Sequence, residues 1–319
     1  MDNLLDLAIC RIPGLKADER LTLLTKFDTE EDFSLLSMKD VENILGRPLK
    51  GPAWKMPDIF AMAKNDAAKT RKLGIRLLSW RNMAYPPLVR EIFDPPVLLF
   101  YRGSLPDPEK PMAAVVGTRK PTPQAAREAY SLGRELGEAG IPVVSGLALG
   151  IDSMAHRGNI EGGSATVAVL GSGPDMIYPV SNRFLARRIL ETGGLILSEY
   201  PPGTEPYRWN FPARNRIISA LARGTVIVEA PEKSGALITA RFALEQNRDL
   251  WVDKAGLSSG NGAGGIRLAE DGAAQISSAA DILAEWRLTA PLSKCPAKTE
   301  RKSADGLASS MAEYLNIKL

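Results

Sequence analysis

The sequence predicts an α/β protein, in which a small N-terminal helical domain precedes a Rossmann-like, doubly wound and mostly parallel sheet. Three observations predict this fold. Short apolar runs alternate with helical segments between about residues 111 and 288, Gly and Ser gather where those runs end, and the first 70 residues show helical spacing only. Alternation of this kind is typical of a parallel sheet that is covered by helices on both faces.

Residues 1–70 are expected to form a helix-hairpin-helix or SAM-like domain of short helices. An apolar helix from Leu4 to Ile9 precedes Ile12-Pro13-Gly14-Leu15, and a second helix follows from Ala17 to Thr25. Gly between two short helices permits a tight turn whose backbone N–H groups reach a DNA phosphate. The same pattern also fits a bundle used only for interaction or spacing, so contact between this domain and DNA stays open.

The Rossmann-like domain is predicted to span residues 71–288, beginning with a proline-rich lead-in over 71–110. The apolar run Val97 to Tyr101 is expected to be an edge strand, because the neighbouring prolines stop a longer ladder. Residues 289–319 are polar. They are expected to form a linker and a short tail, which is too short for a full winged-helix domain.

Strands and helices are expected to alternate through the rest of this domain. The predicted strands are Ala113 to Gly117, Ile141 to Gly146, Ala165 to Gly171, Leu195 to Ser198, Thr225 to Ala230 and Leu250 to Val252. The predicted helices are Thr122 to Ala139, Ile151 to Glu161, Ser181 to Thr192, Arg214 to Arg223 and Gly235 to Gln246.

Small residues follow these strands at the edge where a doubly wound sheet binds ligands. Small side chains let backbone N–H groups and helix N-termini meet an anion directly. Gly and Ser also make ordinary tight turns, but their repetition beside an arginine favours an anionic ligand. The expected ligand-binding residues at the strand ends are Gly117, Arg119, Ser145, Gly146, Gly173, Ser234 and Gly235.

A second signal is a segment that combines arginines with aromatic residues. From Tyr207 to Arg223 there are four arginines and no acidic residue. Arginines bind phosphates, and aromatic rings offer faces on which unpaired bases stack, so the segment favours single-stranded nucleic acid. Its DNA-binding candidates are Arg208, Phe211, Arg214, Asn215 and Arg216. For Arg216, an ion pair with Glu199, Glu205 or Glu229 fits equally well.

The common cofactor and metal sites are missing from the sequence. The first βα turn holds Gly117 alone instead of Gly-x-Gly-x-x-Gly, and no Gly-Lys-Ser/Thr occurs, which argues against a dinucleotide and against a Walker A loop. The two cysteines, Cys10 and Cys295, form no Cys-x-x-Cys, and His156 is the single histidine. We therefore expect no metal and no cofactor.

Asp152 and His156 are four residues apart, one helical turn, on a predicted helix. A catalytic pair is conceivable, but no nucleophile is tied to it. We expect both residues to be structural and to fix the loop after the second strand, so that no catalytic residue is assigned.

Bulk properties place the chain in a reducing, aqueous compartment. The net charge of +3 is a mild excess that does not identify a partner. No stretch approaches 18 consecutive apolar residues, and the acidic N-terminus is unlike a secretory signal. With only two cysteines as well, we expect a cytoplasmic protein with no membrane partner.

Four segments together resemble the DNA-processing protein A (DprA/Smf) family in order and spacing. They are Val116 to Arg119, Ser145 to Asp152 with His156, Phe211 to Leu221, and Ser234 to Ala240. The resemblance implies a protein without enzymatic activity that binds and protects incoming single-stranded DNA and loads a RecA-type recombinase in natural transformation. It also implies a homodimer formed through the Rossmann-like domain and a DNA groove lined by Arg119 and the Arg208 to Arg216 segment.

Two details qualify the resemblance. Val180 follows Tyr178-Pro179 where relatives often have a lysine, so Arg183 is expected to supply the positive charge. A similar glycine-bearing loop occurs in Lonely-guy-type (LOG-like) nucleotide hydrolases, but Phe242 replaces the glutamate that such hydrolysis needs as its acid/base. A nucleotide-binding sensor without catalysis is the other alternative.

Overall fold

The computed structural model describes residues 3–288; residues 1–2 and 289–319, and with them the predicted linker and tail, lie outside the described residues. Residues up to Leu288 belong to one compact unit. Its centre is a nine-stranded sheet in the order β1-β2-β6-β5-β4-β3-β7-β8-β9. The predicted mixed α/β fold with a mostly parallel sheet is confirmed.

Strand β2 is antiparallel to both β1 and β6, and the remaining pairs of neighbouring strands are parallel. The strands are β1 Arg76–Ser79, β2 Leu98–Gly103, β3 Ala113–Val116, β4 Val143–Ser145, β5 Val167–Leu170, β6 Leu195–Ser198, β7 Gly224–Ile227, β8 Asp249–Asp253 and β9 Ala274–Ile276.

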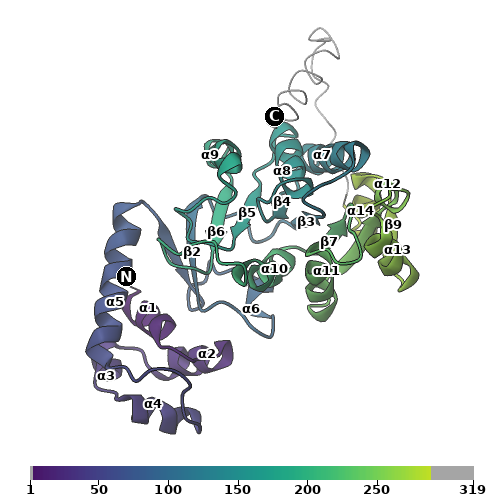
Figure 1. Ribbon diagram of the computed structural model, residues 1–319. Helices are drawn as coiled ribbons and strands as arrows, with labels where there is room; N and C mark the ends of the chain where they lie inside the picture. Colours follow the sequence, from purple (N-terminus) through teal and green to yellow (C-terminus); the bar gives the residue numbers. More distant parts are fainter. Residues whose placement is uncertain (1–2, 289–319) are drawn as a thin grey trace, which may run out of the picture. The chain divides into compact units, whose positions relative to one another are not determined.

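Helices cover both faces of the parallel part of the sheet (Figure 1). Because side chains alternate along a strand, Ala113 and Val115 of β3 pack with α7 and α8, whereas Ala114 and Val116 pack with α10. The helices of this part are α6 Pro87–Arg90, α7 Pro123–Glu138, α8 Ile151–Glu161, α9 Arg183–Glu191, α10 Asn210–Leu221, α11 Ala236–Glu245, α12 Lys254–Leu257, α13 Ala263–Glu270 and α14 Ala279–Glu285.

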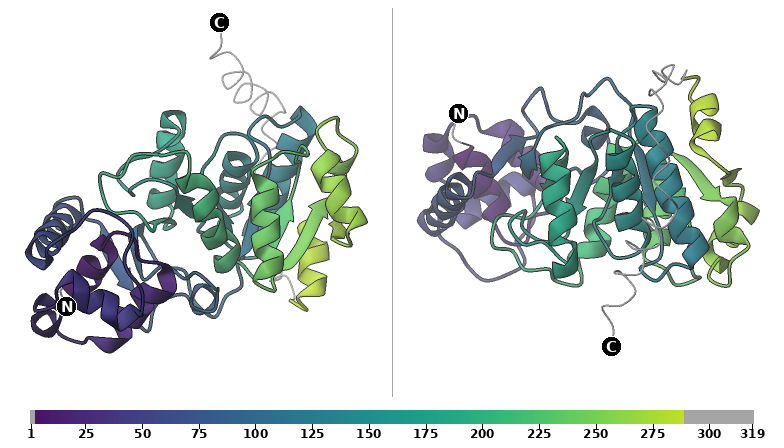
Figure 2. Two further views of the ribbon diagram at one scale, coloured as in Figure 1. Left: turned by 60° about the horizontal axis from the view of Figure 1, so that its bottom comes forward. Right: turned by 90° about the horizontal axis from the view of Figure 1, so that it is seen from above.

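The N-terminal helices pack against the antiparallel end of the sheet (Figure 2). Strand β2 joins the two parts, since Leu98 and Phe100 face the N-terminal helices while Leu99 and Tyr101 face the core of the Rossmann-like part. The N-terminal helices are α1 Leu4–Arg11, α2 Ala17–Lys26, α3 Glu30–Ser34, α4 Met38–Leu45 and α5 Met56–Lys72. No helix among residues 3–288 is long and apolar enough to cross a bilayer.

Gly14 makes the tight turn between α1 and α2, with φ at 76°. A Cβ at this position would collide with the carbonyl oxygen of Lys50, and Arg47 Nη2 donates to the Gly14 carbonyl oxygen at 3.0 Å. The turn therefore packs against the segment that follows α4, which gives a structural reason for the glycine.

The structure corrects the predicted edge of the sheet. Strand β2 lies between β1 and β6, because the prolines precede the strand and leave its own ladder intact. The edge strands are β1 and β9, which have four and three residues and were not predicted. Neither is a continuous apolar run, so neither shows the pattern of a buried strand.

Helix α10 begins at Asn210, four residues before the predicted start at Arg214. Pro212 falls in its first turn, where proline is tolerated because the first N–H groups of a helix have no intrahelical partner. The early start places Phe211, Arg214 and Asn215 on one helix.

Replacing Phe100 by Ala should lower the free energy of unfolding by about 3–5 kcal/mol, because the ring is 2% exposed and leaves a cavity between β2 and the N-terminal helices. Phe93→Ala is the matched control, since that ring is 99% exposed, and its effect should stay within about 0.5 kcal/mol. Denaturant titrations followed by circular dichroism measure both. Equal effects of the two substitutions would contradict this packing.

Candidate functional site

A cavity of about 820 Å³ opens at the point where the strand order reverses. Strand β3 has β4 on one side and β7 on the other, so the loops after β3 and β7 turn to opposite faces of the sheet and leave a crevice between them. Ligands of doubly wound folds bind in such a crevice, outside the carboxyl ends of the strands. Nine predicted site residues line the cavity: Gly117, Arg119, Asp152, Arg208, Phe211, Arg214, Asn215, Ser234 and Gly235.

The lining of this cavity is strongly basic. It contains five basic side chains and a single acidic one, Asp152. Arg119, Lys120, Arg208 and Lys233 are exposed, whereas Asp152 is buried at 6% exposure. An excess of exposed positive charge in a concave site attracts anions and raises their local concentration.

The loop that carries Arg119 is held at several points. The Thr118 N–H donates to the Glu229 carbonyl oxygen at 2.7 Å, and the Ile151 N–H donates to the Thr118 carbonyl oxygen at 3.2 Å. The Glu229 carboxylate, 1% exposed, accepts from the backbone N–H and hydroxyl of Thr122 at 2.8 and 2.9 Å. Arg119 thus projects from a fixed backbone, which lowers the entropic cost of ordering it on a ligand.

Two aromatic rings lie within the cavity. Phe211, half-buried, has its ring centroid 5.6 Å from that of Tyr178 and 5.6 Å from the Arg119 guanidinium carbon. Tyr178 is 45% exposed. The rings and the guanidinium together offer the two surfaces that an unpaired nucleotide uses, a π-face for the base and a cation for the phosphate.

The N-terminus of α11 also opens onto the cavity, at Ser234 and Gly235. A Cβ at Gly235 would meet nothing within 4 Å, so the backbone here is open to a ligand. Asn215 Nδ2 donates to the Gly235 carbonyl oxygen at 3.3 Å and ties α10 to this turn. The N–H groups at a helix N-terminus bind anions directly.

Arg214 occupies a different position from the one expected of a phosphate-binding arginine. It is 4% exposed, and its Nη1 donates to the carbonyl oxygens of Gly146, at 2.8 Å, and Val169. Burial lowers the pKa of Arg214 to about 10, so the group stays charged at neutral pH. Because Nη1 bonds the loop after β4 and β5, Arg214 lies at the floor of the cavity and positions those elements. Its contact with a phosphate stays a prediction.

Asp152 and His156 lie on α8 beneath this floor. Asp152 Oδ2 accepts from the backbone N–H groups of Gly146 and Ala148 at 3.0 and 3.3 Å, and so holds the loop after β4. Burial raises the pKa of Asp152, with the Arg214 charge opposing the shift.

His156 contacts a different element from the one expected. Its Nδ1 lies 2.7 Å from the Thr166 hydroxyl, which itself donates to the Val143 carbonyl oxygen, so the imidazole holds the start of β5 instead of the loop after β4. Burial lowers the pKa of His156 to about 3 and keeps the ring neutral at physiological pH.

Besides His156, five predicted site residues do not line the cavity: Ser145, Gly146, Gly173, Arg183 and Arg216. The first three are buried, and Ser145 donates its hydroxyl to the Val115 carbonyl oxygen at 2.7 Å. Arg183 is exposed at the start of α9. Arg216 bonds Glu199 at 2.9 Å and Asp94 at 3.1 Å. The ion pair with Glu199, which the sequence offered as an alternative, is therefore present, and Asp94 is a second, unpredicted partner of Arg216.

Other cavity residues were missed by the sequence analysis, among them Lys120, Lys233, Tyr178 and Asn261. The two lysines directly precede or follow predicted site residues, and a rule that counts every basic residue in a strand-end loop would have found them. Asn261 comes from the glycine-rich segment after β8, and no local pattern marks it as a site residue. Among residues 3–288, no group of three or more His, Cys, Asp or Glu side chains is placed to hold a metal ion.

Comparisons with known proteins agree with one another. Residues 76–287 match a family model described as DNA recombination-mediator protein A. The DNA processing protein DprA of Bacillus subtilis is 36% identical over 282 residues, which cover 88% of this chain and 94% of that protein. Protein Smf of Synechocystis is 49% identical over 171 residues, and the match covers 52% of this chain and 43% of that protein.

Two solved structures are also similar. The X-ray structure of DNA processing protein A from Streptococcus pneumoniae aligns with a TM-score of 0.75 at 34% identity, covering 89% of this chain and 98% of that one. DNA processing protein A from Helicobacter pylori, whose single-stranded DNA binding mode is known structurally, aligns with a TM-score of 0.58 at 30% identity, covering 66% and 96%.

Replacing Gly146 by Ala should destabilise the protein by about 1–3 kcal/mol, because the new Cβ would collide with the fixed Arg214 guanidinium. Gly235→Ala serves as the control, since open space surrounds that position, and its unfolding free energy should change by no more than about 0.5 kcal/mol. Denaturant unfolding of both variants measures the difference. A fully stable Gly146→Ala protein would show that Arg214 is not held as described.

Proposed function

The chain belongs to the DNA recombination-mediator protein A (DprA/Smf) family, and from this premise we propose that it binds single-stranded DNA in the cavity between β3 and β7. The observation that carries the proposal is the lining of that cavity, which combines four exposed cations with the rings of Phe211 and Tyr178. Cations bind the phosphates, and the rings stack with bases that only an unpaired strand presents.

The proposal extends to the role of the bound strand. We infer that the protein protects single-stranded DNA and delivers it to a RecA-type recombinase, and that it acts as a homodimer in the cytoplasm during transformation or recombination. The support is the family, whose model is described as a recombination mediator, and the DNA-processing names of the relatives.

We propose that the protein acts by binding and not by catalysis. The single carboxylate in the cavity, Asp152, is buried and accepts two backbone hydrogen bonds, and the neutral ring of His156 lies within the core. A general acid or base must reach the substrate proton, but His156 is fully buried and the Asp152 carboxylate is largely buried and already bonded to the backbone.

The two alternatives fit the cavity less well. A LOG-like hydrolase needs a carboxylate where this chain has Phe242, and that ring lines a different cavity, on the other side of α10. A mononucleotide sensor would fill only part of a basic rim that extends from Lys120 to Lys233 and Arg208.

Arg119→Ala should weaken binding of a single strand of about 30 nucleotides and lower the slope of log affinity against log salt by about 0.7, as expected when one phosphate contact is lost. Arg187→Ala is the matched control, because Arg187 is exposed on α9 and already paired with Glu191. Fluorescence anisotropy at several salt concentrations, with the matching duplex and AMP as competitors, measures both. Wild-type binding to AMP alone, or to duplex as tightly as to single strand, would refute the proposed function.

A further inference from the structure

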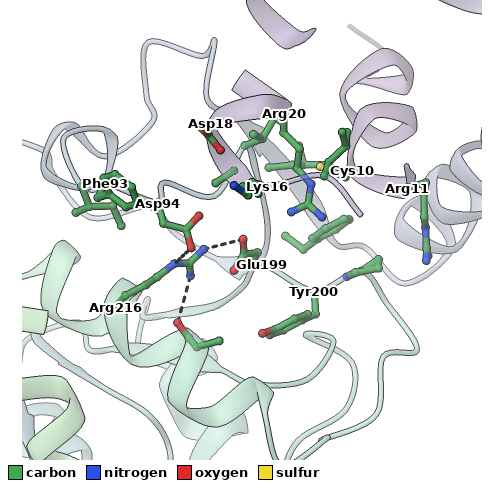
Figure 3. A pocket seen from close by; sticks show the side chains of 18 of the residues that line it. Cys10, Arg11, Lys16, Asp18, Arg20, Phe93, Asp94, Glu199, Tyr200 and Arg216 are labelled. Atoms are coloured by element: carbon green, nitrogen blue, oxygen red, sulfur yellow. Dashed lines mark hydrogen bonds and ion pairs between the residues drawn. The ribbon is translucent and has the colours of Figure 1, made fainter. Parts of the chain in front are cut away.

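We propose that a second cavity, on the opposite side of α10, binds a further nucleotide of the same single strand; this inference rests on the function proposed above. The cavity has a volume of about 880 Å³ and lies between the N-terminal helices and the Rossmann-like part of the unit (Figure 3). Its walls come from α1, α2, the segment before β2, the loop after β6, and α10 and α11.

Two basic side chains of this cavity form no salt bridge within residues 3–288, although the charge of Lys16 helps to lower the pKa of Glu19. Figure 3 shows the side chains of Lys16 and Arg20 pointing into the hollow. No carboxylate among residues 3–288 lies within salt-bridge distance of either one, and the buried Nε of Arg20 has no hydrogen-bond partner. Buried donors without partners are rare and costly, so the Arg20 guanidinium is not fully satisfied within the described residues.

Most of the other charges of the cavity are already matched. Arg11 pairs with Asp66 at 2.5 Å, and Arg216 pairs with both Asp94 and Glu199. Among the remaining acids, Glu245 pairs with Arg241 at 2.7 Å. Asp18 is exposed and forms no salt bridge with the residues that the structure describes. Burial raises the pKa of the Cys10 thiol to about 12, so it stays uncharged. Lys16 and Arg20 are therefore the basic side chains of this lining without a salt bridge, in a lining that holds five acidic and four basic residues in all.

An aromatic ring at the same cavity offers a face for a base. Phe93 lines the cavity and is 99% exposed, although a ring of this size is normally buried. It lies next to Asp94, whose carboxylate is held by Arg216 (Figure 3). Phe93, Lys16 and Arg20 thus line one cavity, as Phe211 and Arg119 line the first.

Helix α10 links the two cavities. Phe211, Arg214 and Asn215 face the first cavity, whereas Ala213 and Arg216 face the second. A helix with its side chains is about 10–12 Å across, so a strand that leaves the first cavity over the first turn of α10 reaches the second within a few nucleotides. A phosphate on Lys16 and Arg20 and a base on Phe93 would continue its path.

The test compares single strands of two lengths, one of about 4 nucleotides that fills the first cavity only and one of about 20 nucleotides. A Lys16→Ala/Arg20→Ala double variant should bind the longer strand roughly tenfold more weakly, with a salt slope lower by about 1.4, as expected for two lost phosphate contacts. Phe93→Ala should weaken binding of the longer strand roughly tenfold through the loss of stacking. Neither change should alter affinity for the shorter strand, whereas Arg119→Ala should weaken both.

Matched controls come from the same parts of the chain. Lys26→Ala/Lys39→Ala removes two exposed charges from the N-terminal helices outside the cavity, and Phe184→Ala removes an exposed ring, 72% accessible, that lines neither cavity. Both should bind the longer strand like the wild type. A strand carrying 5-iodouracil should also photocrosslink to the peptide that contains Phe93.

The outcomes separate this inference from the proposed function. Unchanged affinity of the Lys16/Arg20 variant for the longer strand, while Arg119→Ala still weakens both, overturns the second site alone. A wild type that does not prefer single strands overturns both proposals. If free dTMP binds the wild type but not the Lys16/Arg20 variant, and long-strand affinity is unaffected, the cavity is a mononucleotide site and the strand path is wrong.

Discussion

The buried Arg214 guanidinium is the interaction on which the candidate site depends. It joins α10 to the carbonyl oxygens of Gly146 and Val169, and so fixes the helix against β4 and β5. Removing a guanidinium from water is costly unless its donors are used and a counter-charge is near. Asp152 supplies that charge, since each of the two groups shifts the pKa of the other toward its charged form. The first cavity is therefore built around an internal electrostatic pair.

Much of the fold could be predicted because its signals are local. Each parallel strand of the centre is a short apolar run, and α8 spans the predicted Ile151 to Glu161. The position of the site also followed from local signals, because the carboxyl ends of parallel strands meet at one edge and the small residues after them mark the loops. Gly117, Arg119, Ser234 and Gly235 all line the cavity.

The remaining features depend on contacts between residues far apart in the sequence. An arginine that binds phosphate and one that binds carbonyl oxygens look alike in a sequence, and only the depth of Arg214 below the surface separates them. The antiparallel end of the sheet was missed for a similar reason. Strand β1 is not a continuous apolar run. It forms because its backbone pairs with the edge of β2 that would otherwise be unpaired. Lys16 and Arg20 line a cavity only because the N-terminal helices pack beside β2, and the sequence around them does not indicate this packing.

The periodicity of α10 explains how one short motif serves two cavities. Residues three and four apart share a helix face, so Phe211, Arg214, Asn215 and Ile218 face the first cavity. Ala213 and Arg216, three apart, face the second. The side chains of the three consecutive residues Arg214, Asn215 and Arg216 therefore bond to different partners. Arg214 holds the strand ends, Asn215 holds the α11 turn, and Arg216 holds Glu199 and Asp94. One turn of helix thus fixes the walls of both cavities relative to each other, which is the rigidity that the proposed strand path requires.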